Sequence, residues 1–376
     1  RTELFNFIES EWLDIQDKLN GSGANEYGRV DQVAAWALLS KLYLNAEVWT
    51  GTAKYNESVT YSNKVMSSNY SINTVDANGN GNAYDELFLA DNNTNGAQSG
   101  FIFTLNFDGL RSQTYGGTTF LVHAAIGGNM NATEFGVNGG WGGLRTTSKL
   151  VEKFEVLDID VTTLNSSLGG TQSDWGIVGD GTPNGWGGPD TEMFETATNQ
   201  YSLYAELTDG FLKFRFNEDW GNNYGDDDPQ DGALENGGGN IPVTAGTYYI
   251  TLDLNALTYT ITPFTADKRG MFYTDGQNLE IASIPPFKEG YAVMKFKNVD
   301  VNGDIGNDSS GEFTDVDLPM IRLAEIYLNY AEATLRGGGG DSNLALSLIN
   351  ELRERAYGDT SGNISSGELT LDFILD

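Results

Sequence analysis

Aromatic rings beside amide and charged side chains are the residues of this sequence best suited to a chemical task. A neutral sugar offers a planar patch of C–H bonds, which an aromatic ring can cover, and a rim of hydroxyl groups, which Asn, Asp, Lys and Arg can hydrogen-bond. One stretch supplies both kinds of group, and its candidates are Trp186, Lys213, Arg215, Trp220, Asn223 and Tyr224. This mixture predicts a surface that binds sugar.

Strand periodicity predicts how these candidates are presented. Lys213 and Arg215 alternate with phenylalanines, which places the two basic residues on the outward face of a strand, opposite an apolar core. Trp220 follows in a loop rich in Gly and Asn, and Trp186 lies in another such loop. The alternative is that both tryptophans form the core of a small β domain, because Trp is usually well buried.

Two further aromatic candidates, Tyr115 and Trp141, lie in Gly-rich loops between positions 109 and 147. Loops held by a rigid scaffold are where binding residues concentrate. Residues 139–143 read Gly-Gly-Trp-Gly-Gly, which either presents Trp141 to a ligand or pins the loop to neighbouring helices. We favour pinning for Trp141 and keep ligand contact as the second hypothesis.

Residues for catalysis are scarce. His123 is the only histidine and there is no cysteine, so a catalytic triad, thiol catalysis and a His- or Cys-rich metal site are unavailable. We expect a non-enzymatic protein in which His123 is a packed or loop residue. Paired carboxylates for glycoside hydrolysis stay open, because 53 acidic residues guarantee accidental pairs.

A cofactor is not expected. Residues 76–81 imitate the start of a calcium-binding EF-hand loop, but Leu87 stands at the twelfth position, where that loop needs Glu. We interpret the segment as a turn and keep calcium as the alternative.

Charge excludes one class of partner. The 376 residues include 53 acidic and 21 basic side chains, and the formal charge of −32 would repel a phosphate backbone. Nucleic acid is therefore not an expected partner. The sequence begins at Arg1 without Met and ends in what reads as the opening of a helix, so we expect it to be a fragment.

Helical periodicity marks the two flanks of the sequence. Residues 319–336 place apolar side chains three and four apart, and a second amphipathic helix follows, with Asp341 or Ser342 as its N-cap and Gly358 as its end. The pattern of residues 321–329 recurs 284 positions earlier, at residues 37–45. Repeated helix pairs of this length are typical of TPR-like stacking.

Helical periodicity is absent from the middle of the sequence. Residues 248–254 and 257–261 alternate apolar and polar positions around a short turn, which predicts a β-hairpin. Short strands and Gly/Asn/Asp turns predict an inserted all-β sandwich domain.

The host resembles a known family. Residues 322–333 (RLAEIYLNYAEA) and 349–356 (INELRERA) look like the C-terminal signature of the SusD/RagB family, and segments 28–30, 115–121, 139–145 and 271–276 agree with it in order. The insert is similar to the carbohydrate-binding domains of SusE and SusF over residues 177–186, 211–225 and 246–254. Together these resemblances imply a mainly α, SusD-like helical host with long loops and an inserted β-sandwich. Because the likeness to SusD stops near residue 158 and resumes at residue 267, it implies a division into residues 1–157 and 265–376, which form the host, and residues 158–264, which form the insert.

The resemblance also implies a function and a location. SusD-like proteins are surface lipoproteins, so we expect a lipid-anchored protein on the outer membrane, with the anchor outside this sequence. It would capture oligosaccharide, with α-glucan or starch implied by the insert, and pass it to a SusC-like TonB-dependent transporter. Two alternatives remain: a glycoside hydrolase with an appended binding module, and a TPR-type surface scaffold or adhesin.

Overall fold

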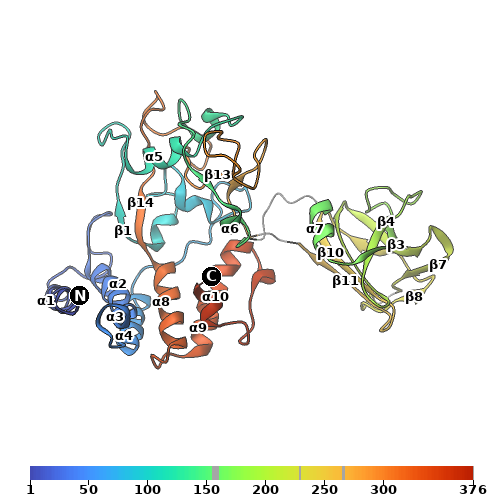
Figure 1. Ribbon diagram of the computed structural model, residues 1–376, viewed down its shortest axis with the longest axis horizontal. Helices are drawn as coiled ribbons and strands as arrows, with labels where there is room; N and C mark the ends of the chain where they lie inside the picture. Colours follow the sequence, from blue (N-terminus) through green and yellow to red (C-terminus); the bar gives the residue numbers. More distant parts are fainter. Residues whose placement is uncertain (155–160, 228–229, 265–266, 376) are drawn as a thin grey trace. The chain divides into compact units, whose positions relative to one another are not determined.

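The computed structural model describes residues 1–154, 161–227, 230–264 and 267–375 (Figure 1). Contacts between Cα atoms divide the chain into two compact units. The first unit comprises Arg1–Glu155 and Asp267–Asp376, and the second comprises Val156–Ala266.

The prediction of a mainly α protein is wrong. About 30% of the chain is helical and 22% is in strands, and the second unit is built on a large curled antiparallel sheet. The physical reason is that helical periodicity is confined to the two flanks of the sequence. The Gly- and Asn-rich segments between the flanks form loops and strands instead.

Most helices of the first unit gather at one end of it, and long loops, short strands and helix α5 form the other end (Figure 1). The α-helices are α1 (Thr2–Ile15), α2 (Gln32–Leu44), α3 (Ala46–Thr50), α4 (Tyr55–Met66), α5 (Gly117–Ala124), α6 (Ser148–Val151), α8 (Leu323–Leu335), α9 (Ser342–Tyr357) and α10 (Leu371–Leu375). The 3-10 helices are η1 (Asp85–Phe88), η2 (Ala97–Gly100), η3 (Ala132–Phe135) and η4 (Thr360–Gly362). The strands are β1 (Phe101–Leu105), β2 (Arg145–Thr146), β12 (Phe272–Tyr273), β13 (Tyr291–Val293) and β14 (Leu318–Arg322).

The helices pack in a row, with α2 against α4, α4 against α8, and α8 against α9 (Figure 1). One apolar core runs through them, including Val33, Tyr330 and Leu348. Lys41 Nζ lies 2.6 Å from Glu325 Oε1, so an ion pair joins the two positions that the 284-residue repeat makes equivalent. The two copies of the repeat, on α2 and α8, therefore lie next to each other in the structure.

The predicted ends of α9 are confirmed. The Asp341 carboxylate accepts hydrogen bonds from the Asn343 and Leu344 amides, and Gly358 ends the helix with φ +86°. In α8, by contrast, the predicted start at residue 319 is wrong, because Leu318–Arg322 forms β14 and pairs antiparallel with β1. Leu318 precedes a proline, which favours the extended conformation there.

The spacing of residues 3–19 predicts a helix with one apolar face, formed by Leu4, Phe7, Ile8, Trp12, Ile15 and Leu19. The helix α1 is present, but its buried face differs in part: Phe5 is buried, while Leu4 and Phe7 are 62% and 59% exposed. Phe5 packs on the core below α2 together with Ile8 and Trp12, so the helix is rotated about its axis relative to the prediction.

The second unit is one curled antiparallel sheet, shown with helix α7 in Figure 1. Along it the strands run in the order β11, β10, β5, β4, β3, β6, β7, β8, and β9 also pairs with β6. The elements are α7 (Val161–Ser167), β3 (Thr171–Val178), β4 (Thr191–Ala197), β5 (Gln200–Leu207), β6 (Gly210–Phe216), β7 (Asp219–Gly225), β8 (Glu235–Asn236), β9 (Ile241–Val243), β10 (Gly246–Asp253) and β11 (Thr258–Pro263).

The predicted hairpin is confirmed, since β10 pairs with β11 in antiparallel register. The predicted division into two stacked sheets is wrong, because β3 pairs with β4 on one side and with β6 on the other and so keeps the sheet continuous. The sheet curls until its ends meet: a β-bridge joins Ala233 to Thr258, and the Leu234 amide donates to the Leu257 carbonyl over 2.9 Å. The curl encloses an apolar core that includes Phe214 and Ile250.

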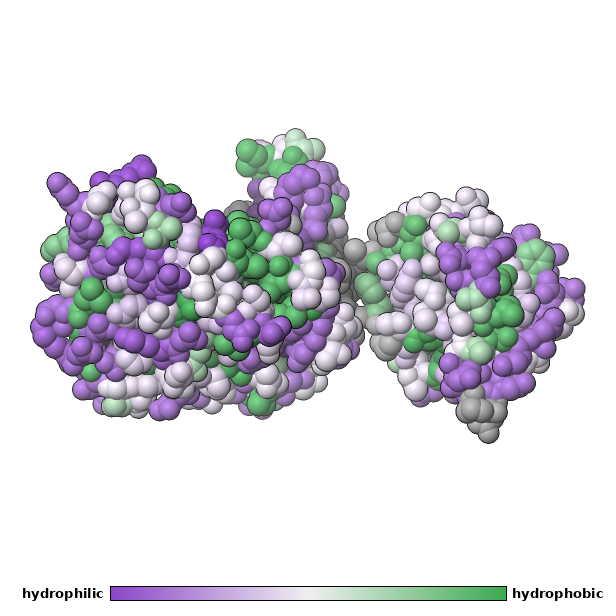
Figure 2. All heavy atoms as spheres, turned by 90° about the horizontal axis from the view of Figure 1, so that it is seen from below, coloured by the Kyte–Doolittle hydropathy of each residue, from purple (hydrophilic) through white to green (hydrophobic). Residues whose placement is uncertain are grey.

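The surface carries both hydrophilic and hydrophobic residues. On the face drawn in Figure 2, hydrophilic residues surround separate small apolar patches. Within the part of the chain that the structure describes, every helix is too short or too polar to cross a membrane.

Candidate functional site

Trp186 and Trp220 form an exposed pair of rings on the second unit. Trp220, on β7, is 47% exposed, and Trp186, in the loop between β3 and β4, is half-buried. Their ring centroids lie 6.0 Å apart and the ring planes are inclined by 35°. The alternative of a sealed tryptophan core does not hold, because both side chains reach the surface; we call these two residues the tryptophan pair.

Arg215 supports the tryptophan pair from below. Its guanidinium carbon lies 4.4 Å from the centroid of the Trp220 ring, which is a cation–π contact. Its Nε and Nη2 donate to the two oxygens of Asp190 over 2.9 and 2.5 Å. These hydrogen bonds raise the pKa of Arg215 above its ordinary value, so the charge under the ring is permanent. Arg215 therefore fixes the orientation of Trp220.

A tight turn brings Trp220 over Arg215. Asn217 and Glu218 connect β6 to β7 with φ values of +50° and +56°, the left-handed backbone of a type I′ hairpin. Glu218 and Asp219 are exposed beside the ring and contribute to the raised pKa of Arg215. Their carboxylates are acceptors for hydroxyl groups at the rim of the aromatic surface.

The prediction that Lys213 and Arg215 lie on an open outward face is wrong. Lys213 is 8% exposed and Arg215 is 3% exposed, although their neighbour Phe214 fills the opposite side of the strand. Both faces of β6 are covered, because the loop carrying Asp190 folds over Arg215, and Lys213 Nζ donates to the Gly237 carbonyl over 3.3 Å. Burial lowers the pKa of Lys213, an effect that Asp227 opposes.

Asn223 and Tyr224 also face inward. Asn223 is 8% exposed, and its Nδ2 donates to the Trp220 carbonyl over 2.6 Å, which braces the strand beneath the ring. The Tyr224 ring packs 5.7 Å from the buried Trp175 ring. Of the six candidates predicted in this unit, the structure thus brings Trp186, Trp220 and Arg215 together and turns the other three into support.

Tyr115 and Trp141 come together in a second aromatic surface, on the first unit. Their ring centroids lie 6.3 Å apart, with Phe313 5.2 Å from Tyr115 and Phe120 6.1 Å from Trp141. Tyr115, Phe120 and Trp141 are 59%, 44% and 45% exposed. We call Tyr115, Phe120, Trp141 and Phe313 the aromatic cluster. Its rings are inclined to one another by 46° to 53°.

Trp141 is pinned and exposed at once. Its amide donates to the His123 carbonyl over 2.7 Å, and its ring stacks on the His123 ring with a centroid distance of 4.6 Å and an interplanar angle of 14°. His123 lies on α5 and is buried. Its Nδ1 is 2.6 Å from the Gly139 carbonyl oxygen and its Nε2 is 3.1 Å from that of Glu312. His123 thereby ties three segments of the surface together.

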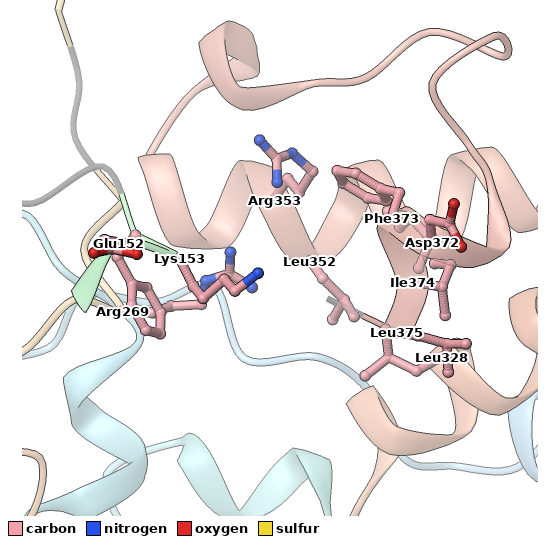
Figure 3. Close-up of a pocket in the computed structure, with 12 residues that line it drawn as sticks. Glu152, Lys153, Arg269, Leu328, Leu352, Arg353, Asp372, Phe373, Ile374 and Leu375 are labelled. Atoms are coloured by element: carbon pink, nitrogen blue, oxygen red, sulfur yellow. The ribbon is translucent and has the colours of Figure 1, made fainter. Parts of the chain in front are cut away.

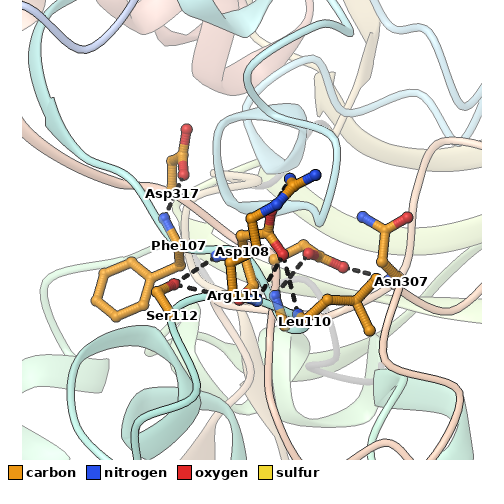
Figure 4. A network of polar contacts seen from close by, with 9 residues as sticks. Phe107, Asp108, Leu110, Arg111, Ser112, Asn307 and Asp317 are labelled. Carbon is orange, nitrogen blue, oxygen red and sulfur yellow. Dashed lines mark hydrogen bonds and ion pairs between the residues drawn. The ribbon is translucent and has the colours of Figure 1, made fainter.

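Buried carboxylates hold the loops that carry the cluster (Figure 4). Asp317 accepts from the Phe107 amide over 2.7 Å, and Asp315 accepts from the Gly109 and Asn307 amides. Asp108 closes the turn beside them by accepting from the Leu110 and Arg111 amides over 2.9 and 3.0 Å. These bonds fix the loop that leads to Tyr115.

A further carboxylate holds the opposite loop. Asp308 accepts from the amides of Glu312 and Phe313 over 3.2 and 2.9 Å and from the Ser310 hydroxyl over 2.7 Å. Partial burial raises the pKa of Asp308, but the hydrogen bonds outweigh it and hold that pKa below its ordinary value. The Tyr115 hydroxyl donates to the Glu312 carboxylate, which raises the pKa of Tyr115 and joins the two loops.

An open pocket of about 1030 Å³ lies elsewhere on the first unit, beside α9 and α10 (Figure 3). Its lining mixes the apolar Leu352 and Leu375 with the charged Arg269 and Arg353. Phe154 and Phe373 also line it, but both are partly buried, whereas the two aromatic surfaces contain rings that are 44% to 59% exposed.

In the segment that resembles a calcium-binding loop, residues 76–81, the Asp76 carboxylate accepts hydrogen bonds from backbone amides. Asp76 accepts from the Gly79, Asn80 and Gly81 amides over 2.9, 3.2 and 2.7 Å. Across the described residues, no group of three or more His, Asp or Glu side chains is placed to hold a metal ion.

Three contributors escaped the sequence prediction. Asp190 lies 25 residues from Arg215 in a Gly-rich loop, and Phe313 lies almost two hundred residues from Tyr115. Neither pairing leaves a local signal. Phe120, by contrast, belongs to the same Gly-rich stretch as Tyr115, and its position on a short helix could have been inferred.

Comparisons with known proteins agree on one family. The sequence profile of the SusD family matches residues 99–376. The starch-binding protein SusD of Bacteroides thetaiotaomicron is 27% identical over 360 residues, which cover 94% of this chain and 50% of that protein. The chain thus spans about half the length of this relative.

Solved structures share the fold. A SusD-like carbohydrate-binding protein from Bacteroides fragilis superposes with a TM-score of 0.52 at 15% identity, covering 100% of this chain and 54% of that one. A second SusD-like protein from the same species gives a TM-score of 0.50 at 18% identity, covering 100% of this chain and 56% of that one.

Proposed function

Because this chain belongs to the SusD family, whose members are non-enzymatic carbohydrate-binding proteins, we propose that it binds glycan through two aromatic surfaces without cleaving it. The tryptophan pair is the first surface and the aromatic cluster is the second. Each offers exposed rings for the C–H face of a sugar and carboxylates for its hydroxyl rim.

The geometry of the tryptophan pair is the observation that carries the proposal. Trp220 is almost half exposed, its inner face rests on a permanent cation, and Trp186 stands beside it at an angle of 35°. Two inclined rings follow a ligand that curves from one sugar to the next better than they follow a flat ribbon. This favours an α-glucan such as starch over a straight β-linked chain.

The two surfaces define roles for the two parts of the chain. We propose that residues 158–264 are a carbohydrate-binding domain of the SusE/SusF kind inserted into a SusD-like host. The aromatic cluster of the host would be an independent second site. Support comes from the separate apolar core of each unit and from the position of each aromatic surface within a single unit.

Family likeness supports a place and a partner. We propose that the protein acts on the outer face of an outer membrane, through a lipid anchor outside residues 1–376, and delivers oligosaccharide to a SusC-like TonB-dependent transporter. The row of helices α2, α4, α8 and α9 would provide a docking surface for that transporter. Copurification of the tagged protein with such a transporter from cell envelopes tests this assignment.

The test of glycan binding is the Trp220→Ala variant. Removing one desolvated aromatic anchor should weaken binding of maltoheptaose at this surface by about 1–3 kcal/mol, measured by titration calorimetry. Trp49→Ala is the matched control, because Trp49 is also an exposed tryptophan, 42% exposed on α3, and belongs to neither surface. Unchanged affinity in Trp220→Ala would remove the tryptophan pair from the site.

The same preparation separates the alternatives. Retardation of the protein on a starch gel without release of reducing ends supports glycan binding alone. Release of reducing ends would favour a glycoside hydrolase whose carboxylates lie among the many acidic residues. Failure to bind any glycan on an array would favour a scaffold or adhesin.

A further inference from the structure

Three cationic side chains surround one pair of aromatic rings in the first unit. Tyr84 and Phe88 meet edge to face with centroids 5.3 Å apart. Lys295 Nζ lies 5.3 Å from the Tyr84 centroid and 4.4 Å from that of Phe88. The guanidinium carbon of Arg355 lies 5.4 Å from Tyr84, and that of Arg322 lies 5.7 Å from Phe88. We call Lys295, Arg322 and Arg355 the cationic cluster.

No member of this cluster forms an ion pair with a carboxylate in the described part of the chain; the groups of opposite sign that act on Arg355 are Tyr84 and Glu351. Arg355 is 8% exposed, and its Nε is buried without a hydrogen-bond acceptor; one Nη of Arg322 is in the same state. Among the ion pairs of the described residues, none involves a member of the cluster. The adjacent Asp267 pairs instead with Arg269, over 2.5 Å.

An unpaired buried guanidinium is costly, because desolvation is not compensated. Cation–π contacts offset only part of that cost. Burial, followed by the charges of Arg322 and Arg269, lowers the pKa of Arg355 to about 10, although Tyr84 and Glu351 act in the opposite direction.

Two features make the position suitable for an anion. Helix α8 begins at Leu323, directly after Arg322, and no side chain caps it, so the positive end of the helix dipole adds to the cluster. Access is available as well. Lys295 and Arg322 are only half-buried, so two of the three cations are partly open to solvent.

We propose that the cationic cluster is a binding site for an oxyanion. Guanidinium groups donate in a planar fork that matches the oxygens of phosphate, sulfate or a carboxylate, and Lys295 adds a third positive charge. The oxyanion has two conceivable sources, a free inorganic ion or the carboxylate of a polypeptide side chain. Both present the same oxygens to the same three residues.

Thermal unfolding at constant ionic strength tests the proposal. Replacing sodium chloride by sodium phosphate should raise Tm of the chain by at least about 2 °C, because the anion binds only the folded state. In Arg355→Met the rise should disappear, and in Arg29→Gln it should persist, since Arg29 is an exposed arginine paired with Glu26. If Arg355→Met does not fold, Arg322→Gln takes its place.

A second probe distinguishes the sources. N-acetylglutamate α-amide has a free side-chain carboxylate as its only charged group. The rise in Tm that it causes is compared with the rise caused by phosphate at equal ionic strength. A larger rise with phosphate assigns the site to a free inorganic ion, and a larger rise with the glutamate derivative assigns it to a polypeptide carboxylate. Equal Tm in chloride, phosphate and the glutamate derivative would overturn the proposal, as would a rise that survives in Arg355→Met.

Discussion

Trp220 and Trp141, the exposed tryptophans of the two aromatic surfaces, each have one ring face occupied by a side chain of the protein. The guanidinium of Arg215 lies under Trp220, and the imidazole of His123 lies under Trp141. Both supporting residues are buried and hydrogen-bonded, so neither ring has to be ordered when a ligand arrives. Preorganisation of this kind lowers the entropic cost of binding.

The buried pair of Arg215 and Asp190 makes a prediction for stability. Both side chains are 4% exposed, so Asp190→Ala leaves an uncompensated charge and should destabilise the second unit by about 3–5 kcal/mol. Glu152→Gln is the control, because Glu152 forms an exposed pair with Lys149 and should cost no more than about 1 kcal/mol. Denaturant titration compares the two. Equal losses would mean that the buried pair has no special role.

Asp308 makes a prediction for pH. Its pKa is lowered in the folded protein, so its contribution to stability is present above the unfolded value near 3.8 and is lost as pH falls through the lower folded value. Asp308→Asn should therefore lose about 1–2 kcal/mol of unfolding free energy at pH 7, and the difference from the wild type should shrink below about pH 4. Urea titrations at several pH values measure it. A difference that is constant down to pH 2.5 would contradict the assignment.

At the scale of elements, loops become rigid where backbone comes close to backbone. An added Cβ at Gly140 would lie 2.2 Å from the Ile126 carbonyl oxygen, so only glycine allows the loop carrying Trp141 to approach the end of α5. At the neighbouring Gly139 an added Cβ would meet nothing within 4 Å. The close approach of the two backbone segments thus requires glycine at position 140 but not at position 139.

Gly140→Ala should therefore destabilise the protein by about 1–3 kcal/mol, because the clash is with backbone and the loop must move. It should also shift Trp141 and weaken glycan binding at the aromatic cluster. Gly139→Ala should leave both properties unchanged. Calorimetric melting and oligosaccharide titration of the two variants decide the matter, and similar behaviour of the two would show that the close approach is not required.

Sequence periodicity located the elements better than it located their neighbours. The spacing of apolar residues predicted α9 and its caps, and alternation predicted the hairpin of β10 and β11. It failed at residues 318–322, where pairing with the distant β1 overrides the helical pattern, and at Lys213 and Arg215, where loops distant in sequence cover a face that alternation left open. Pairing partners far apart in the chain cannot be inferred from local spacing.

At the scale of the whole molecule, each unit has its own core and its own aromatic surface. Under the proposed function, these surfaces are two weak sites on one chain that can engage one polymer, and linked sites raise apparent affinity without any new contact. A short oligosaccharide would occupy each proposed site separately, so a titration with it counts the sites.

Stoichiometry therefore gives a direct prediction. Maltoheptaose should bind the wild type at two sites per chain. Trp220→Ala and Trp141→Ala should each keep one site at the affinity of the wild type and weaken the other by about 1–3 kcal/mol, and the double variant should weaken both. On soluble starch each single variant should lose about 10- to 100-fold in apparent affinity, since avidity is lost with either site. Calorimetry and affinity electrophoresis measure the two quantities. A wild-type stoichiometry of one would exclude one of the surfaces.

The contact between the two ends of the curled sheet affects how readily the second unit can pair with strands of other molecules. The bridge between Ala233 and Thr258 occupies main-chain groups at the start of β11, where the sheet would otherwise expose an unpaired border. Unpaired borders of this kind recruit strands from other chains and seed fibrils. By curling onto itself, the second unit covers the border at the start of β11, so that another chain cannot pair with it there.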